Sequence, residues 1–207
     1  MLRVIHLLLL TWHAFARVPS PKDRKTIIEC HTKLREEVKP PANNMQLLSY
    51  SMELEKLAND IIYYCNNGYP KDFLRGQQVE YFEMDFRDRA PQYSDLCKIN
   101  TSITAYGKEG CLTDCFIYLH MINSETTEVG CSYGICHNKF PLVHNPEYIV
   151  CVYRPMKPIT FKSKPYEPGI SCMKCPSGYE CHRNQCRKNS FIIKQLQFPE
   201  CIAKLSS

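Results

Sequence analysis

Thirteen cysteines constrain this 207-residue chain more than any other feature, and all of them follow an N-terminal segment typical of a secretory signal. That segment has a basic start at Arg3, an apolar run from Val4 to Leu10 and a small-residue cleavage site ending at Ala16. A cysteine-rich chain that enters the secretory pathway is held together by disulfides. We therefore expect residues 1–16 to be removed and the mature, extracellular chain to fold on a disulfide framework. Because the cysteine count is odd, at least one thiol stays free or pairs between molecules.

Charge and hydropathy narrow the possible partners. The formal net charge is +5, and the positive charge is dispersed except around Arg183 to Lys188. This dispersed positive charge does not favour nucleic acid as a binding partner. The apolar N-terminal run is too short to span a membrane, and no later segment is apolar enough to do so. The length suits one domain of about 150 residues with an appendage.

Two runs of alternating side chains predict a pair of strands with one buried face each. The first covers Val129 to Ile135 and the second Tyr148 to Val152. Residues 139–146 separate them and contain Pro141 and Pro146, so we expect a connecting loop. An antiparallel arrangement follows, clipped to the rest of the fold by nearby cysteines.

Three of the four helices expected before these strands have helical periodicity. Ser20-Pro21 begins the first and Pro40-Pro41 stops it, Ser51 caps the second, and Thr113 caps the fourth. The expected buried faces are Ile27, Ile28, His31, Leu34 and Val38 in the first helix, Leu54, Leu57, Ala58, Ile61 and Cys65 in the second, and Leu112, Cys115, Phe116, Leu119 and Ile122 in the fourth.

The composition changes after Pro155. Residues 157–169 are proline-rich and predict a linker, and residues 170–207 begin with a compact four-cysteine module between Cys172 and Cys186. A CxxC spacing can indicate zinc or redox chemistry, but in a secreted chain the disulfide interpretation is stronger. Asn100 begins a glycosylation sequon.

These motifs, in this order, resemble the CAP superfamily, which includes cysteine-rich secretory proteins, venom antigens, pathogenesis-related proteins and helminth venom-allergen-like proteins. The resemblance rests on TTEVGC followed by YIVCVYRP, on HTKLR in the first helix and on the LxxLA spacing of the second. It is nearest in type to the helminth proteins. It implies an α+β fold, a three-layer α-β-α sandwich over residues 22–156, with the third helix beginning at Pro91. The C-terminal module resembles the hinge of cysteine-rich secretory proteins.

The resemblance also implies a set of disulfides. The implied pairs are Cys65–Cys136, Cys131–Cys151, Cys172–Cys181 and Cys175–Cys186. A further family bridge is absent, because Arg75 and Arg154 stand at both of its positions. Five cysteines stay unassigned; among them we expect Cys115 to be bridged and Cys201 to be the odd thiol, and we leave open the pairing of Cys30, Cys97 and Cys111.

Many CAP proteins have a cleft with two histidines and two acids that can hold a divalent metal. The matching positions here are Tyr69, Gln77, Asp95 and Ile117. No histidine lies between His31 and His120, so we expect no metal and no cofactor. His120 lies one turn from Ile117 and could substitute, although one imidazole and one carboxylate make a poor zinc site. We interpret His31 as a packed structural residue, and His137 and His144 as solvated loop residues.

Two functions of different classes follow from the resemblance. No nucleophile is paired with a base in a local motif, so we expect no enzyme activity. The less charged cleft favours an amphipathic ligand, although its side chains could simply fill it. Some CAP proteins carry sterols on a mobile aromatic loop, which Tyr81, Phe82 and Phe86 match in location, and some hold fatty acids between two helices. The alternatives are aromatics that anchor a loop on the core, and a scaffold that binds host or self extracellular proteins without a small ligand.

Overall fold

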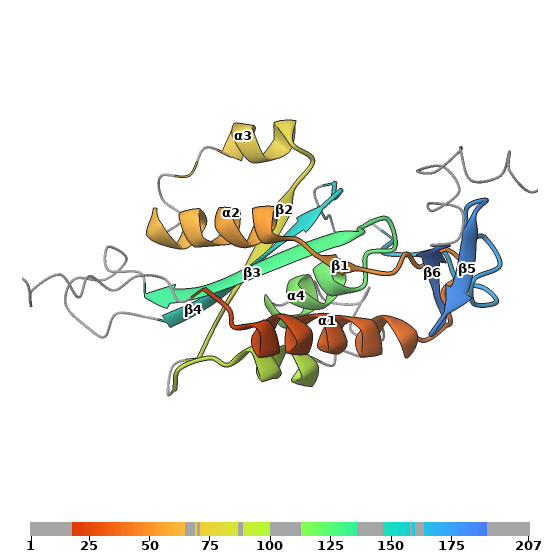
Figure 1. Ribbon diagram of the computed structural model, residues 1–207, viewed down its shortest axis with the longest axis horizontal. Helices are drawn as coiled ribbons and strands as arrows, with labels where there is room; N and C mark the ends of the chain where they lie inside the picture. The colour runs from red at the N-terminus through yellow and green to blue at the C-terminus, as the bar shows by residue number, and fades with distance from the viewer. Residues whose placement is uncertain are drawn as a thin grey trace, which may run out of the picture.

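The structure is a computed structural model that describes residues 18–64, 69, 71–86, 89–99, 113–135, 147–157, 159 and 164–189. A central sheet of four strands organises the molecule. The strand order is β1-β3-β4-β2, with β1 parallel to β3 and the other neighbours antiparallel. Figure 1 shows helix α2 on one side of this sheet and helices α1 and α4 on the other, as in a three-layer α-β-α sandwich. The strands are β1 (Ser49–Tyr50), β2 (Glu80–Asp85), β3 (Glu128–Ile135) and β4 (Glu147–Arg154), and the helices are α1 (Pro21–Glu36), α2 (Met52–Tyr63), α3 (Lys71–Gly76), the 3-10 helix η2 (Tyr93–Lys98) and α4 (Thr113–Met121).

The expected strand pair forms the middle of the sheet. β3 and β4 are antiparallel along their full length, and Cys131 lies opposite Cys151 and is disulfide-bonded to it. Side chains of β4 alternate between two hydrophobic clusters. Ile149, Cys151 and Tyr153 belong to the cluster that includes α1 and α4 residues, whereas Val150 and Val152 belong to the α2 cluster. Both faces of these strands are therefore buried, rather than one as expected, because helices cover both sides of the sheet.

A glycine lets α2 lie directly on β3. A Cβ built on Gly130 would lie 2.2 Å from the backbone nitrogen of Glu55 and 2.5 Å from the carbonyl carbon of Leu54. No side chain fits into that space. The backbone of Ser51 also donates a hydrogen bond to Val129 at 2.9 Å. The glycine of the VGC motif therefore fixes how closely the first turn of α2 approaches the sheet.

Helix α1 begins as expected and ends earlier. Ser20 and Asp23 form a capping box at its beginning. The helix ends at Glu36, before Pro40, so Val38 lies beyond it. Its fully buried charged residue is Arg35, whose guanidinium donates to four backbone carbonyls, those of Gln46, Met121, Asn123 and Thr126.

The other helices agree with the expected starts. α2 follows its cap Ser51 and ends at Tyr63, and α4 begins at Thr113. The third expected helix is only the short η2, which a disulfide between Cys30 and Cys97 joins to α1. Cys115 is also disulfide-bonded. Several predicted features lie outside the described residues: the Cys65–Cys136 pair, Leu112, Cys111, Cys201 and the sequon at Asn100.

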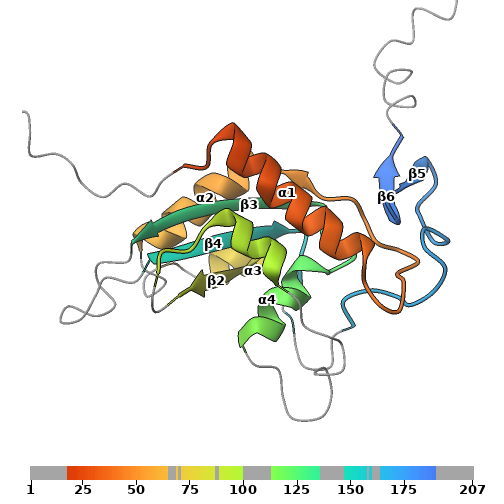
Figure 2. The ribbon, with the colours of Figure 1, turned by 90° about the horizontal axis from the view of Figure 1, so that it is seen from below.

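The C-terminal module is a two-stranded hairpin held by two disulfides. Its strands β5 (Tyr179–His182) and β6 (Gln185–Lys188) pair antiparallel. The disulfides are Cys172–Cys181 and Cys175–Cys186, the pairs that the hinge resemblance implies. Figures 1 and 2 show the hairpin beside the C-terminal end of α1.

This module is bonded tightly to the sandwich. The backbone of Cys186 donates to Met45 at 2.6 Å and accepts from Leu47 at 2.9 Å. The buried side chain of Gln185 donates to the Thr32 carbonyl at 3.1 Å. Arg183 donates to the carboxylates of Glu36 at 2.8 Å and Glu29 at 3.0 Å.

The described end of the expected linker is packed as well. Tyr166 is buried with Val38, Ala42 and Met45. The backbone of Gly169 donates to Pro41 at 2.8 Å. The domain boundary at residues 157–169 stays a prediction, because the contacts between the sandwich and the C-terminal module do not divide them into two separately folding parts. In the part of the chain that the structure describes, none of the helices has the length and hydropathy to cross a bilayer.

Candidate functional site

The four positions that match the family's metal cleft lie in different surroundings. Tyr69 packs edge to face on the rings of Tyr64 and Phe73, in the cluster on the α2 side of the sheet. Gln77 is exposed after α3. Ile117 is buried in the cluster on the opposite side. No hydrogen bond, ion pair or ring contact between described residues joins any two of these positions, Asp95 included.

Asp95 is occupied by cations of its own segment. Its carboxylate accepts hydrogen bonds from both Arg89 terminal nitrogens at 2.7 and 2.9 Å, from Lys98 at 2.9 Å and from the Gln92 backbone at 2.8 Å. The hydrogen bonds from Arg89, opposed by burial, hold the pKa of Asp95 well below its usual range. The carboxylate therefore fixes η2 and has little capacity left for a ligand.

Zinc does not fit these residues. Tyr69, Gln77 and Ile117 offer no imidazole, and the one carboxylate is already bound four times. Within the described ranges, no group of three or more histidine, cysteine or acidic side chains is arranged to hold a metal.

The two described core histidines are held neutral. His31 donates through Nδ1 to the Ile27 carbonyl at 2.7 Å, and its Nε2 accepts from the Tyr153 hydroxyl at 2.7 Å. Burial lowers the pKa of His31 to about 4. His120 donates through Nδ1 to the Phe116 carbonyl at 2.7 Å, and burial lowers its pKa too. Both imidazole rings pack against Tyr153, so both histidines have a structural role in the hydrophobic core. His137 and His144 lie outside the described residues.

Two of the three aromatic residues expected on a mobile loop, Tyr81 and Phe82, lie in a strand instead, so the loop placement is wrong for these two. Tyr81 and Phe82 are in strand β2, with Tyr81 on the α2 side and Phe82 in the opposite cluster. Phe82 is 5% exposed. Phe86 follows the strand, and the Arg89 guanidinium stacks on its ring at 3.9 Å. The strand alternation places Tyr81 on the opposite side of the sheet from Phe82 and Phe86, so the three side chains do not form one aromatic surface.

A pocket of about 600 Å³ lies between the beginning of α1 and the beginning of η2. We call it the α1–η2 pocket. Its far wall is formed by the strand residues Tyr133 and Ile149. The full lining is Val18, Ser20, Lys22, Asp23, Thr26, Ala90, Pro91, Gln92, Tyr93, Ser94, Tyr133 and Ile149.

The pocket lining is mixed in polarity. The exposed side chain of Val18 and the half-buried rings of Tyr93 and Tyr133 offer apolar surface, whereas Lys22 is an exposed cation that forms no ion pair with a described residue. The Tyr93 hydroxyl is buried without a hydrogen-bond partner. Burial raises the pKa of Tyr93, with Tyr50 and Asp23 adding to the shift. An unpartnered buried hydroxyl is costly and favours a polar ligand atom or water beside it.

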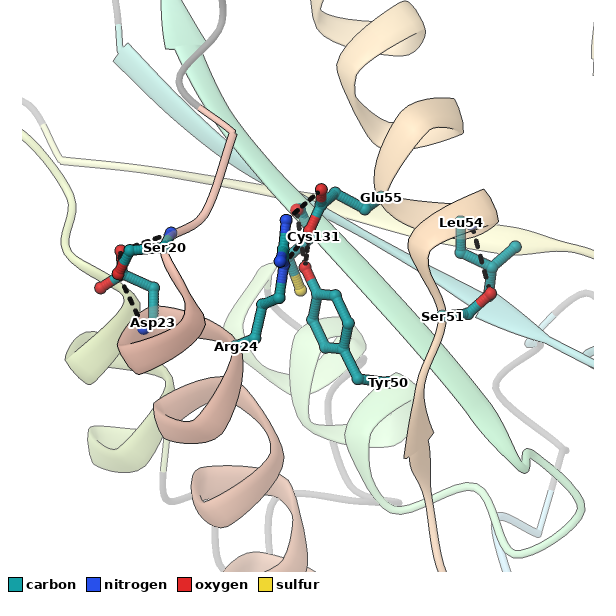
Figure 3. A network of polar contacts seen from close by, with 8 residues as sticks. All are labelled: Ser20, Asp23, Arg24, Tyr50, Ser51, Leu54, Glu55 and Cys131. Carbon is teal, nitrogen blue, oxygen red and sulfur yellow. Dashed lines mark hydrogen bonds and ion pairs between the residues drawn. The ribbon is translucent and has the colours of Figure 1, made fainter.

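A partly buried ion pair fixes the α1 wall of the pocket. Figure 3 shows Arg24 of α1 pointing to Glu55 of α2, with two hydrogen bonds of 2.8 and 2.9 Å. The Tyr50 hydroxyl donates to Glu55 at 2.6 Å and also lies 3.3 Å from the Cys131 carbonyl. The capping box of Ser20 and Asp23 lies in the same turn of α1 (Figure 3). Together with the Cys30–Cys97 bridge to η2, these contacts hold both walls in place.

Sequence patterns identified the pocket residues only as helix beginnings. Ser20 and Pro91 were expected to start helices, but nothing in the pattern says that the two helices face each other. The one available signal was the pair Cys30 and Cys97, whose connection was left open.

Comparison with known proteins places these features in a family. The profile described as "Cysteine-rich secretory protein family" (CAP) matches residues 28–153. Peptidase inhibitor 15-A of Danio rerio is 28% identical over 193 residues, which cover 82% of this chain and 72% of that protein. The structure of Schistosoma mansoni venom allergen-like protein 4 aligns with a TM-score of 0.54 at 25% identity, covering 75% of this chain and 100% of that one. NaASP2, crystallised with Zn²⁺, shares the fold with a TM-score of 0.59 at 20% identity, over 82% and 97% of the two chains. Since the profile spans more than half of the sequence, and both structures share the three-layer sandwich, the chain belongs to the cysteine-rich secretory protein (CAP) family.

Proposed function

We propose that this chain is a secreted, non-enzymatic binding protein whose α1–η2 pocket takes an amphipathic ligand of the fatty-acid type. The observation that carries the proposal is the pocket itself, with apolar surface from Val18 and Tyr93 and a free cation, Lys22, among its lining residues. Its volume of about 600 Å³ lies within the range of small-molecule sites. An acyl chain would cover the apolar surface, and a carboxylate would meet Lys22 in a charge-assisted hydrogen bond.

A sterol is less well supported than a fatty acid. The sterol hypothesis depends on Tyr81, Phe82 and Phe86 forming an exposed aromatic surface, and the strand places Phe82 in the core. The non-enzymatic part of the proposal rests on side-chain chemistry. Every described cysteine is disulfide-bonded, and both core histidines use Nδ1 to bind a backbone carbonyl.

The first test is extraction of the purified secreted protein, followed by mass spectrometry of whatever it carries. The second is calorimetric titration with oleate, comparing Lys22→Met with Lys25→Met. Lys25 is an exposed lysine of the same helix that does not line the pocket. We expect Lys22→Met to weaken binding several-fold and Lys25→Met to leave it unchanged. Equal effects, or no oleate binding by the wild-type protein, would contradict the proposal.

A second candidate is an extracellular protein-binding scaffold without a small ligand. It is favoured by the relative described as a peptidase inhibitor and by the rigidly bonded C-terminal hairpin, which keeps its basic residues in fixed positions. Peptidase-inhibition assays with the ligand-free protein test it. Inhibition that persists in an Ala90→Phe variant, whose pocket is filled, would favour the scaffold over the ligand carrier.

A further inference from the structure

Four aromatic side chains meet on the surface where α2 ends and α3 begins. We call Tyr63, Tyr64, Tyr69 and Phe73 the aromatic corner. Three of them are among the exposed large hydrophobic side chains of the described residues: Tyr63 is 76% exposed, Tyr64 53% and Phe73 49%. Aromatic side chains are largely buried in most folds, and a contiguous exposed group of them marks an interaction site more often than an accident of packing.

The rings contact one another in series. The centroids of Tyr63 and Tyr64 are 5.2 Å apart with planes at 90°, and those of Tyr64 and Tyr69 are 5.9 Å apart at 65°. Tyr69 and Phe73 continue the series at 6.1 Å and 66°. In edge-to-face pairs the ring faces are turned at a steep angle to each other. Adjacent faces therefore bound a corner that is open to solvent, rather than a flat stack.

A carboxylate lies beside this corner. Asp60 is one helical turn before Tyr64, whose backbone nitrogen donates to the Asp60 carbonyl at 3.0 Å, so both side chains lie on one face of α2. The Asp60 carboxylate forms no ion pair or hydrogen bond with a described residue. It is close enough to Tyr69 to add to the rise in the pKa of that hydroxyl, which burial mainly causes.

Packing alone does not account for these rings. Tyr69 does contact the α2 cluster and anchors the group on the core. Tyr63 and Tyr64 come directly after Ile61 and Ile62, the last buried residues of the helix. Their rings add exposed apolar surface that is not needed to bury those two isoleucines. Their ring faces and the Asp60 carboxylate offer negative potential, and no described cation forms an ion pair with Asp60.

We propose that the aromatic corner and Asp60 bind a quaternary ammonium group of the choline type. Aromatic faces attract cations through the ring quadrupole, and a carboxylate at the same place adds a full negative charge. A trimethylammonium group has no N–H, so it loses no hydrogen bonds to water when it meets ring faces. A lysine or arginine side chain would lose several, and the ring faces would not replace them.

This site is independent of the α1–η2 pocket. The aromatic corner belongs to α2 and α3 on one side of the sheet, and the pocket lies at α1 and η2 on the other. Loss of fatty-acid binding and loss of choline binding would therefore report on different residues.

The test is titration of the full mature protein with choline, followed by calorimetry or by NMR shifts of the tyrosine ring protons. The control ligand is the neutral isostere of choline in which tert-butyl replaces trimethylammonium. We expect choline to bind and the isostere to bind much more weakly. Asp60→Asn and Tyr64→Leu should each weaken choline binding roughly two- to fivefold. Met52→Ala, at an exposed apolar residue at the beginning of α2, should have no effect.

Two sources of the headgroup are distinguished by a further arm with phosphatidylcholine vesicles. Co-flotation with vesicles, lost in Tyr64→Leu, assigns the site to a lipid headgroup; binding of free choline without co-flotation assigns it to a soluble ligand, and either result supports the proposal. Equal binding of choline and its neutral isostere overturns it. The proposal is also overturned if the wild-type protein does not bind choline, or if Asp60→Asn binds choline as tightly as the wild type.

Discussion

Acid should destabilise this fold through His31. The imidazole is fully buried, and its two nitrogens are committed in the neutral form, one donating to Ile27 and the other accepting from Tyr153. A proton on Nε2 would face the Tyr153 hydroxyl and bring a charge beside the Arg35 guanidinium, without water to solvate it. Burial, opposed by the bond to Ile27 and reinforced by Arg35, therefore lowers the pKa of His31 from 6.5 to about 4.

The size and sign of the effect follow by linkage. Between those two pH values the unfolded chain binds a proton at His31 that the folded chain does not, so the contribution is complete above pH 6.5 and is lost as the pH falls toward 4. The shift corresponds to about 3 kcal/mol in the free energy of unfolding. That is a large fraction of the stability of a typical domain.

Urea unfolding of the oxidised protein at a series of pH values, with a matched His31→Gln series, measures this contribution. Carboxylates and His120 titrate in both proteins, so the difference between the two curves isolates His31. We expect the wild-type free energy of unfolding to fall more steeply below pH 6.5 than that of His31→Gln, whatever the stability of the variant at neutral pH. Parallel curves would refute the argument that the buried neutral imidazole is the acid-sensitive group.

Three further predictions concern the core, the pocket walls and metal. Phe82→Ala should lower the free energy of unfolding by about 3–5 kcal/mol, because the ring is buried against His120 and Tyr153. A melting temperature near that of the wild type would contradict the burial of this side chain. Serine at both Cys30 and Cys97 should lower the free energy of unfolding by about 2–4 kcal/mol and weaken oleate binding, because the bridge joins the pocket walls; unchanged oleate affinity in the folded variant would disconnect the bridge from the pocket. Calorimetry with zinc should show no tight stoichiometric site at the family's cleft positions, and micromolar binding abolished by changes there would contradict this.

The periodicity and capping residues of single segments predicted the central strands and the first two helices. The alternation in Val129 to Ile135 and Tyr148 to Val152 predicted the central strands, and the caps at Ser20 and Ser51 predicted the first two helices. These signals come from the side chains that each element buries and from the backbone groups that each cap satisfies.

Features that depend on distant neighbours were missed. Residues of strand β2 were matched to a loop, because its aromatic and acidic side chains reveal no partner strand; pairing with β4 decides its structure. Arg35 was not expected inside, because its burial depends on four carbonyls from other segments. The α1–η2 pocket joins segments that share no local signal, so only the fold brings Lys22 close to Tyr93.

The bonding of the C-terminal hairpin to the sandwich has a consequence for biosynthesis. Cys186 exchanges backbone hydrogen bonds with Met45 and Leu47, and Gln185 reaches Thr32 across 153 residues of sequence. During synthesis the early segment emerges long before its partners do, and such distant contacts form late. We expect the end of α1 and the segment after it to remain incompletely bonded until Cys186 has emerged from the ribosome, so that this part of the fold is completed late in synthesis.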